Sequence, residues 1–483
     1  MQIPLTGGQS KSRSKNFNLT LRRNCFSEVS ESENSKTPTA LVGTPGLKLF
    51  TTVTPTSGST GRGMYVTASE RLFTVVGSTL AEIDNNGVVT NRGELNTNNG
   101  PIHMVDNGLE LIVVDGTNGY LLTLATNIFL EINLTNFPAS EGFPDDATHV
   151  VFMDQYFIAN QANTNKFFIS GLSDGGTWIA DDFGTAEYAP DHIQSMETLR
   201  SNIWTFCDDT IEVFYNSGAA TFPFKRVQGA VQEFGTLAKN STAKMNNSVF
   251  WLGSNKDGNR VVFKSNGYNA VRISTHDIEA ELAEMSELSD AVGFTYQQEG
   301  HYFYQLNFQI GNKTLCWDDT TQNWHDRTHR TSMGAIGRSR ALYQSLFNET
   351  NYVSDYDNGN VYEYDLDTYT DNGEKIQRLF TLPHLHNNLQ FVYFKNLQID
   401  METGVGLVTG QGDDPQLIMR FSDDGGHTWS NNILGAIGKI GEYTTRLKWN
   451  RLGRSRNRVF EFSMTDPVKF FVIEANIDAE VGQ

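Results

Sequence analysis

The segment LELIVVDGTNGYLLTL, residues 109–124, contains two apolar runs separated by the residues Asp115-Gly116-Thr117-Asn118-Gly119. Runs of this length that are rich in Leu, Ile, Val and Tyr are typical of β-strands. Asp-Gly and Asn-Gly dipeptides between two such runs are strong signals for a tight turn. The segment therefore predicts a β-hairpin.

Six further segments have the same organisation of strand, turn and strand. They are MYVTASERLFTVVG (from Met64), HVVFMDQYFIANQ (His149), LRSNIWTFCDDTIEVFYNSG (Leu199), SVFWLGSNKDGNRVVFKSNG (Ser248), HYFYQLNFQIGNKTLCWDD (His301) and NYVSDYDNGNVYEYD (Asn351). The hairpins start roughly 40 to 53 residues apart, which is close to the length of a propeller blade. We therefore expect an all-β protein with a β-propeller-like body of about seven blade-like units. The alternative is a set of antiparallel sandwich hairpins that are evenly spaced by coincidence.

The composition fits this fold and limits the function. The chain has 483 residues, 43 glycines and only 12 prolines, and it lacks a run of 18 apolar residues and an apolar segment after its first charges. We therefore expect neither a membrane anchor nor a secretory signal. A net charge of −19 argues against coating of DNA, although DNA could still slide past such a protein. The distant Cys25, Cys207 and Cys316 form no disulfide or zinc pattern, which favours a reducing compartment.

Composition changes along the chain predict three regions. Residues 1–42 are polar and are expected to form an extended N-terminal arm. Residues 43–385 are expected to form the β-propeller-like domain. Residues 386–483 contain longer strands with clean alternation, which predicts a β-sandwich-like C-terminal domain. One amphipathic helix is expected within Ser274–Asp290, where Ile278, Leu282, Met285 and Leu288 have helical spacing. Ser274 and Asp277 resemble a capping box, and the acidic residues of this helix are expected to face solvent.

The C-terminal region contains FSDDGGHTWS, residues 421–430, which is similar to the Asp box of sialidases and other propeller glycosidases. Ser422, Asp424, Gly426 and Trp429 fit a structural turn, because Asp can accept backbone N–H bonds, Gly permits positive φ and Trp can pack beneath the turn. LSDGGTW, residues 172–178, is a partial echo. An Asp-box glycosidase or sialidase, or a glycan-binding propeller module, is the alternative function.

Sequence spacing singles out no pair of carboxylates of the kind glycosidases need. The histidine pairs His325 with His329 and His384 with His386 are interpreted as ordinary loop residues, since no carboxylate or cysteine completes a metal pattern. We predict no catalytic, cofactor-binding or metal-binding residues, and we expect that the protein is not an enzyme.

A dense basic patch, RLKWNRLGRSRNR, stands out in the acidic chain. It contains Arg446, Lys448, Arg451, Arg454, Arg456 and Arg458. These cations are candidates for a contact with another subunit or with phosphate. The alternative is a solvated strand and turn.

The chain resembles the packaged-DNA stabilisation, or head-completion, tail-hub proteins of short-tailed phages. The resemblance runs through LVGTPGLKLF (residues 41–50), DDTIEVFYNSG (208–218), VQEFGTLAKNSTAKMNNSVFWLG (231–253), SNGYNAVRISTHDIEAEL (265–282) and the closing segment from Arg446. It implies a structural virion protein of the phage tail, assembled in the host cytoplasm as a ring of six copies beneath the portal and adaptor. The implied partners are the adaptor, a tail needle or nozzle protein, a tail spike or fibre, and packaged double-stranded DNA that passes without sequence-specific binding.

Overall fold

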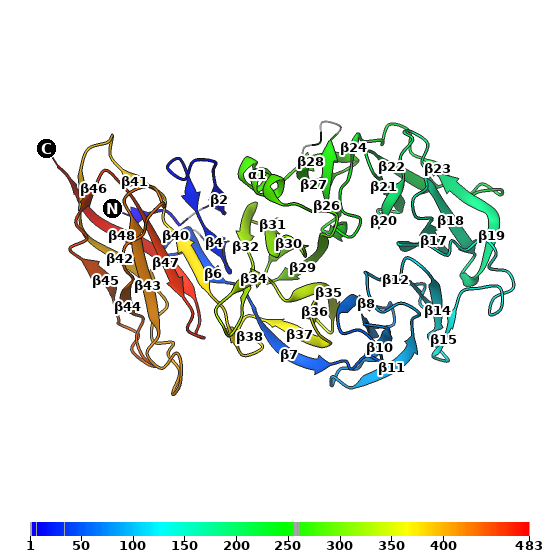
Figure 1. Ribbon diagram of the computed structural model, residues 1–483, viewed down its shortest axis with the longest axis horizontal. Helices are drawn as coiled ribbons and strands as arrows, with labels where there is room; N and C mark the ends of the chain where they lie inside the picture. Colours follow the sequence, from blue (N-terminus) through cyan, green and yellow to red (C-terminus); the bar gives the residue numbers. More distant parts are fainter. Residues whose placement is uncertain (1, 6, 33, 256–257, 259, 483) are drawn as a thin grey trace.

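The computed structural model describes residues 2–5, 7–32, 34–255, 258 and 260–482. Figure 1 shows an elongated molecule with a ring of sheets at one end and a β-sandwich at the other. The predicted fold class, an all-β chain with a propeller body, a terminal sandwich and one helix, is confirmed. Within the described residues, no helix is long and apolar enough to cross a membrane.

The first four blades are four-stranded antiparallel sheets that follow one another along the chain. They contain β8 (Gly61–Val66), β9 (Leu72–Val76), β10 (Thr79–Ile83) and β11 (Val89–Glu94); β12 (His103–Asp106), β13 (Glu110–Val114), β14 (Gly119–Thr123) and β15 (Ile128–Glu131); β16 (Val150–Met153), β17 (Tyr156–Asn160), β18 (Lys166–Gly171) and β19 (Asp174–Thr185); β20 (Ile193–Leu199), β21 (Asn202–Cys207), β22 (Ile211–Asn216) and β23 (Phe224–Arg226).

The next three sheets have the same antiparallel core, to which further strands are added. They contain β24 (Phe234–Thr236), β25 (Ala243–Met245), β26 (Ser248–Asn255), β27 (Arg260–Asn266) and β28 (Asn269–Arg272); β29 (Val292–Gln298), β30 (His301–Phe308), β31 (Lys313–Asp318) and β32 (Asn323–Asp326); and β35 (Ala341–Phe347), β36 (Thr350–Asp355) and β37 (Asn360–Asp365). Two short strands, β33 (Thr328–Arg330) and β34 (Ile336–Arg338), form a separate hairpin.

The inner strands β8, β12, β16, β20, β25, β29 and β35 each contact the next, and β35 contacts β8, so the ring is closed. Each hairpin predicted from the sequence lies in a different one of these sheets. The hairpins from Met64 and His149 are the first and second strands of their blades, whereas the other hairpins are the second and third. This difference contributes to their uneven spacing. The turn of the hairpin from Ser248 includes residues 256, 257 and 259, which lie outside the described residues.

The last blade is completed by a strand from the beginning of the chain. β7 (Gly46–Thr52) pairs antiparallel with β37, and the short β38 (Thr370–Asp371) and β39 (Glu374–Lys375) extend this sheet. Gly46 is required here, because a Cβ atom at this position would lie 2.2 Å from the carbonyl oxygen of Thr368. Segments more than 300 residues apart are thereby locked together in one sheet.

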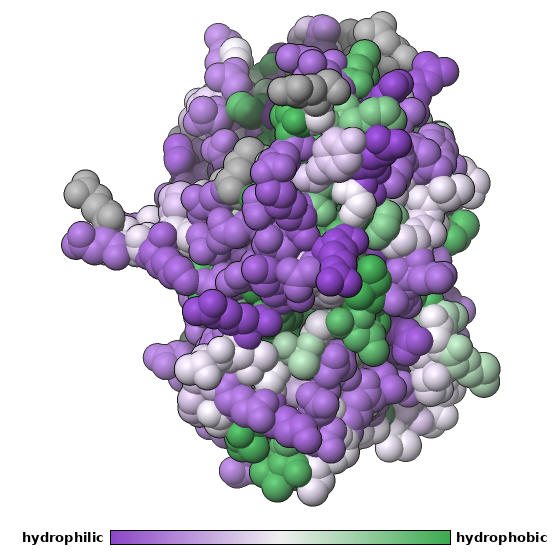
Figure 2. Space-filling view, turned by 90° about the vertical axis from the view of Figure 1, so that its left-hand side faces the viewer, coloured by the Kyte–Doolittle hydropathy of each residue, from purple (hydrophilic) through white to green (hydrophobic). Residues whose placement is uncertain are grey.

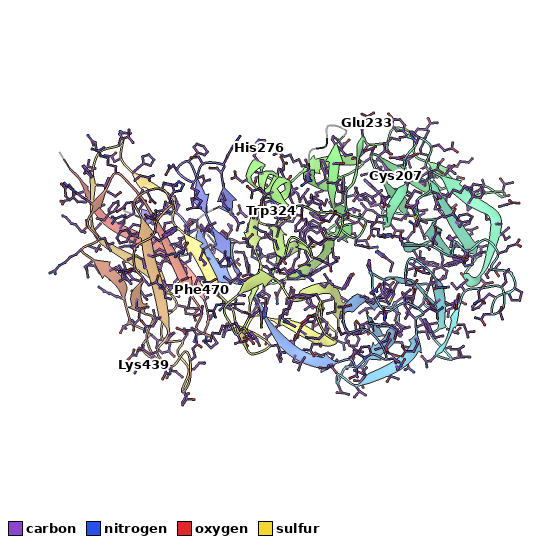
Figure 3. All side chains as sticks on the ribbon, in the orientation of Figure 1. Cys207, Glu233, His276, Trp324, Lys439 and Phe470 are labelled. Carbon is purple, nitrogen blue, oxygen red and sulfur yellow. The ribbon has the colours of Figure 1, made fainter. Side chains whose placement is uncertain are left out.

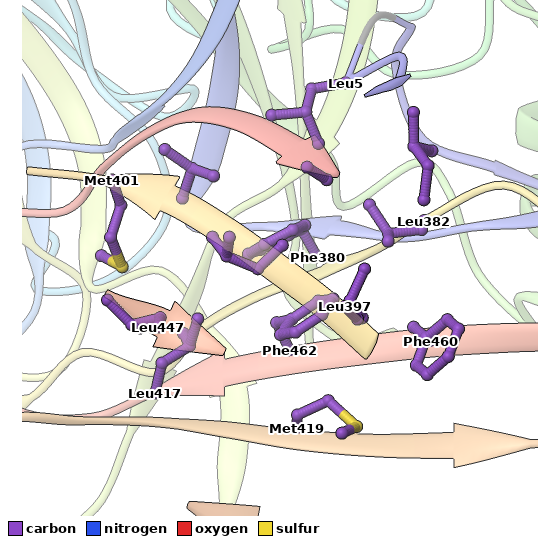
Figure 4. Close-up of a cluster of buried hydrophobic side chains, with 14 of the residues drawn as sticks. Leu5, Phe380, Leu382, Leu397, Met401, Leu417, Met419, Leu447, Phe460 and Phe462 are labelled. Atoms are coloured by element: carbon purple, nitrogen blue, oxygen red, sulfur yellow. The ribbon is translucent and has the colours of Figure 1, made fainter. Parts of the chain in front are cut away.

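The sandwich is built from two sheets. One has the order β45-β42-β48-β6-β5, and the other continues blade strand β32 through β4, β40, β47, β43 and β44. The short strands β1, β41 and β46 pair with β48, β47 and β42. The strands of the sandwich are β1 (Gln2–Ile3), β4 (Arg22–Arg23), β5 (Cys25–Val29), β6 (Thr39–Gly43), β40 (Arg378–Thr381), β41 (Leu385–His386), β42 (Val392–Met401), β43 (Gln416–Ser422), β44 (Ile433–Ala436), β45 (Leu447–Asn450), β46 (Arg454–Ser455), β47 (Asn457–Met464) and β48 (Phe471–Val481). Figure 4 shows apolar side chains from both sheets meeting in its core, among them Phe380, Leu397, Leu447 and Phe462.

The described part of residues 1–42 does not form a separate arm. Strands β1, β4, β5 and β6 join the sheets of the sandwich, while β2 (Ser10–Lys11) and β3 (Leu19–Thr20) form a hairpin beside it. The sandwich also includes β40, which begins at Arg378, before the expected boundary at 386. Such short strands leave no periodic pattern in a polar sequence, because their partners are supplied by distant segments.

The helix α1 (His276–Glu284) is shorter than expected and begins one residue later. Its N-cap is Thr275, whose hydroxyl accepts from the backbone N–H of Ile278 at 3.4 Å, and the expected cap Ser274 donates to Glu279 at 2.8 Å instead. Ile278 and Leu282 are buried as predicted, whereas Met285 is the C-cap.

The acidic side chains of α1 are not simply solvated. Glu279 pairs with Arg272 at 2.5 Å, Glu281 pairs with Lys313, and Asp277 accepts a hydrogen bond from Ser10. The carboxylates therefore bind neighbouring strands, and part of the helix surface faces the N-terminal hairpin.

Candidate functional site

The Asp-box segment forms a turn between β43 and β44 that uses its own polar groups. Ser422 Oγ donates to Asp424 Oδ1 at 2.7 Å and accepts from the Gly426 N–H at 2.7 Å. Asp424 also accepts from the backbone N–H groups of His427 and Thr428, both at 2.9 Å, and from the Thr428 hydroxyl at 2.6 Å. Hydrogen bonds from Ser422 and Thr428 hold the pKa of Asp424 well below its usual range. The carboxylate is thus fully occupied by its own turn.

The tryptophan of this turn lies differently from the one in the partial echo. Trp429 is half-buried, and the guanidinium of Arg420 lies over its ring at 4.7 Å from the centroid. In the echo, Asp174 accepts from a backbone N–H at 2.9 Å and Trp178 is completely buried in its blade. The same short pattern therefore supports a hairpin in both domains.

The residue before the Asp-box aspartate joins the turn to the basic segment. Arg458 donates from Nε to Asp423 Oδ1 at 2.6 Å and from Nη2 to Oδ2 at 2.7 Å. Its guanidinium also donates to the Leu452 carbonyl and lies over the rings of Phe421 and Phe394 at 4.0 and 4.8 Å. Since Arg458 is only 2% exposed, it cannot serve as the subunit or phosphate contact predicted from the sequence. Arg458 instead links the Asp-box turn to the Leu452 carbonyl inside the sandwich.

The other cations of the basic patch are exposed. Arg446 and Lys448 belong to the β45 region, where Lys448 is opposite Gln398 of β42. Arg451 has a positive φ of 58° and begins an exposed segment that carries Arg454, in the two-residue strand β46, and Arg456. The sequence patch therefore divides into the β45 region, an exposed segment and one buried arginine. The close spacing of the cations along the sequence could not reveal this division, because the sheet that packs against each residue decides whether it is buried.

Arg454 and Arg456 form a cluster with exposed aromatic side chains. Each guanidinium lies 4.6 Å from the ring centroid of Phe391, and Arg454 donates to the Tyr393 hydroxyl at 3.1 Å. Phe391 and Tyr393 are 37% and 40% exposed, and the neighbouring Leu389 is 78% exposed. Figure 2, which faces this end of the molecule, shows a mostly hydrophilic surface with small hydrophobic areas within it. Cation–π contacts of this kind hold the arginines in place while leaving their edges free to bind a partner.

The histidines of the two pairs make structural contacts and do not come together in one site. His384 faces Asn457 Oδ1 and the Lys15 carbonyl, each at 2.9 Å, whereas His325 and His329 are buried in different strands. In the part of the chain that the structure describes, no group of three His, Cys, Asp or Glu side chains is placed to hold a metal ion.

Sequence reasoning missed a polar cluster at the junction of propeller and sandwich. His301 of blade strand β30 places Nδ1 2.8 Å from Asp318 Oδ2 and Nε2 2.8 Å from Glu28 Oε2, which belongs to β5 of the sandwich. Burial alone would lower the pKa of His301, but the bonds to Asp318 and Glu28 raise it above the usual value. The cluster borders a cavity of about 330 Å³ that is also lined by Phe470, which Figure 3 shows between the two domains.

Solved structures match this chain only at very low sequence identity and low TM-score. The N-terminal domain of Nup159 is 10% identical, with a TM-score of 0.42, covering 71% of this chain and 98% of that one. YCF48 from Cyanidioschyzon merolae is 10% identical, with a TM-score of 0.42, covering 66% and 99%. The WD40 propeller domain of Doa1 is 11% identical, with a TM-score of 0.39, covering 66% and 96%.

Family models match both domains. The model described as Bacteriophage P22 Gp10, beta-propeller, matches residues 1–369, and the model described as Bacteriophage P22 Gp10, beta-sandwich, matches residues 377–480. No match was found among curated protein sequences. The gap between the two matches, residues 370–376, contains β38 and β39 and ends just before β40, the first strand with which the chain returns to the sandwich. The chain belongs to the bacteriophage P22 Gp10 family and is a structural protein of a phage tail.

Proposed function

We propose that this protein is a tail hub that joins the head of a short-tailed phage to the distal tail. In this proposal it assembles as a ring of six copies beneath the portal and adaptor, helps to retain packaged DNA and carries the tail needle or nozzle and the spikes or fibres. The single observation that supports this most strongly is the match of the P22 Gp10 family to both the propeller and the sandwich, in that order.

The charge of the chain is compatible with a conduit for DNA. A net charge of −19 disfavours adhesion to phosphates, so double-stranded DNA could pass the protein without sequence-specific binding. We propose that assembly takes place in the host cytoplasm and needs no membrane anchor.

The proposed role is structural and not enzymatic. The Asp-box carboxylate, which first suggested glycoside chemistry, is bound by Ser422, His427 and Thr428 of its own turn. The motif is therefore explained by hairpin geometry. Turnover of a fluorogenic glycoside by the purified protein, lost on substitution of a single Tyr or Glu, would contradict this part of the proposal.

Electron microscopy of the purified virion would test the position and copy number directly. We expect a ring of density between the adaptor and the distal tail that fits the propeller and sandwich, and we expect the protein in virion mass spectra. Absence of the protein from purified virions would rule out the proposed function. A position at the distal tip of the tail would rule out the role beneath the adaptor.

A further inference from the structure

We infer that copies of this chain bind one another head to tail, with the arginine cluster at the sandwich end of one copy seated on an acidic bulge at the propeller end of the next. The inference rests on the ring proposed above, and it adds the surfaces that form the ring. The two surfaces lie at opposite ends of the long axis, near β46 and near β19 (Figure 1).

The first surface is the exposed segment with Arg454, in β46, and Arg456. Both side chains are exposed, and their guanidinium groups are held against Phe391 at 4.6 Å. None of the ion pairs found among the described residues includes either arginine. Glu480 of β48, the next strand beyond β42, is an acid in this region, but it pairs with Lys395. The arginines therefore keep free hydrogen-bond donors beside an exposed apolar surface.

The second surface is a bulge at the outer edge of the third blade. Between the pairs Phe168 with Phe183 and Ser170 with Trp178, one residue of β18 is opposite residues 179–182 of β19. The extra residues leave the ladder, and a bulge of this kind turns its side chains away from the sheet. Ile179 is consequently 50% exposed at this edge.

The side chains presented by this bulge are acidic. Asp181 is exposed and Asp182 is half-buried, and the Gly142 N–H donates to the Trp178 carbonyl at 3.0 Å, which places the loop with the exposed Glu141 alongside. No ion pair in the described part of the chain uses these three carboxylates. The nearby Lys166 instead lies over the ring of Phe183 at 4.4 Å.

The two surfaces match in charge and in character. One offers cations beside exposed Leu389 and Phe391, and the other offers anions beside exposed Ile179. The acidic helix α1 is a poorer counterpart, because Glu279 and Glu281 already bind cations of this same chain. Complementary charge of this kind steers association and fixes its register.

The positions of the surfaces determine the type of assembly. A contact between two different patches of the same chain is heterologous, and repetition of such a contact gives a closed ring when its rotation closes. The arginine cluster and the acidic bulge would then both be used by every copy in the ring.

A charge swap tests the contact. The full-length protein would be compared with R454E/R456E, with D181R/D182R and with the combined variant by light scattering after size exclusion, at low and high salt. K375E/K439E is the matched control for R454E/R456E, because it makes the same change of charge at two exposed lysines away from both surfaces. Lys439 lies at the lower tip of the sandwich in Figure 3.

We expect the wild type and the control to associate, and the association to weaken with salt. Each one-sided reversal should raise the dissociation constant by about tenfold or more, and the combined variant should recover most of the loss. Circular dichroism would verify that every variant is folded. Wild-type protein that remains monomeric, or a one-sided reversal that associates normally, would overturn the inference.

Virions separate this inference from the proposed function. If the wild type enters tails and R454E/R456E also enters normally, only the contact is wrong. If the wild type itself is absent from tails, the proposed function is wrong.

Discussion

Arg458 donates two parallel hydrogen bonds to Asp423, at 2.6 and 2.7 Å. These bonds join the Asp-box turn to β47. The arginine is buried between aromatic rings, whereas the Asp423 side chain is 44% exposed. The pair is therefore anchored from the inside, and the segment with Arg454 and Arg456 ends next to a fixed residue.

Replacing Arg458 should destabilise the sandwich. Arg458→Met removes two charge-assisted hydrogen bonds and leaves Asp423 without its cation, so we expect the free energy of unfolding to fall by about 2 kcal/mol. Urea unfolding followed by tryptophan fluorescence would measure this. Arg456→Met, at an exposed position, is the control. The double variant Arg458→Met with Asp423→Asn should recover part of the loss, and a purely additive result would contradict the coupling.

The Asp-box carboxylate should matter for stability and not for chemistry. Asp424→Ala removes the acceptor of two backbone N–H groups, so we expect a lower melting temperature, while His427→Ala, whose side chain takes no part, should be neutral. Because the folded-state pKa of Asp424 is lowered, its contribution is present above the unfolded value and is lost as the pH falls towards the folded one. The difference from wild type should therefore shrink in acid. A difference that is independent of pH would argue against this assignment.

The His301 cluster should make the junction of propeller and sandwich sensitive to pH. Both ring nitrogens face carboxylate oxygens, so the fully bonded form is the imidazolium. Since the pKa of His301 is raised, its contribution is complete below the unfolded value of about 6.5 and is lost as the pH rises through the folded value.

We therefore expect His301→Gln to lower the melting temperature most below about pH 6.5, with a smaller effect in alkali. Glu28→Gln should have a smaller effect than Asp318→Asn, because Glu28 is 40% exposed and Asp318 is 1% exposed. A loss that grows with pH would show that the histidine is neutral in the folded protein.

Gly46 should be essential for closure of the propeller. An added methyl group would lie 2.2 Å from the carbonyl oxygen of Thr368 and 2.6 Å from that of Thr370, so Gly46→Ala must displace backbone. We expect a loss of about 1–3 kcal/mol, the usual range for overpacking. The exposed Lys48→Ala on the same strand breaks only a surface ion pair and should cost about 0.5 kcal/mol. Equal effects of the two substitutions in thermal unfolding would contradict the closure role.

Several features of the fold could be predicted because they are local. Apolar runs separated by short polar turns, some with Asp-Gly or Asn-Gly, specify hairpins, and each of the predicted hairpins, including that at residues 109–124, lies in its own blade. Ile278 and Leu282 likewise marked the buried side of α1. The exact cap was missed, since Ser274 and Thr275 are chemically alike and the neighbouring strands decide which of them faces the helix.

The candidate site was less predictable, because the tertiary structure decides which of its residues are buried and which are exposed. Six cations stand within residues 446–458, and nothing in their spacing distinguishes the buried Arg458 from the exposed Arg454 and Arg456. The acidic bulge at residues 179–182 has the same difficulty, because its exposure follows from a shift in the register of β18 and β19.

By itself, the sequence determined the β-hairpins, the helix, the self-contained Asp-box turn and the change of texture between propeller and sandwich, because each depends on residues that are close along the chain. Only the tertiary structure decided that β7 closes the last blade, that β1, β4, β5 and β6 join the sheets of the sandwich, and that Arg458 and His301 hold distant strands together. These features depend on contacts between segments hundreds of residues apart, and a strand of two or three residues has no signal of its own until its partner is in place.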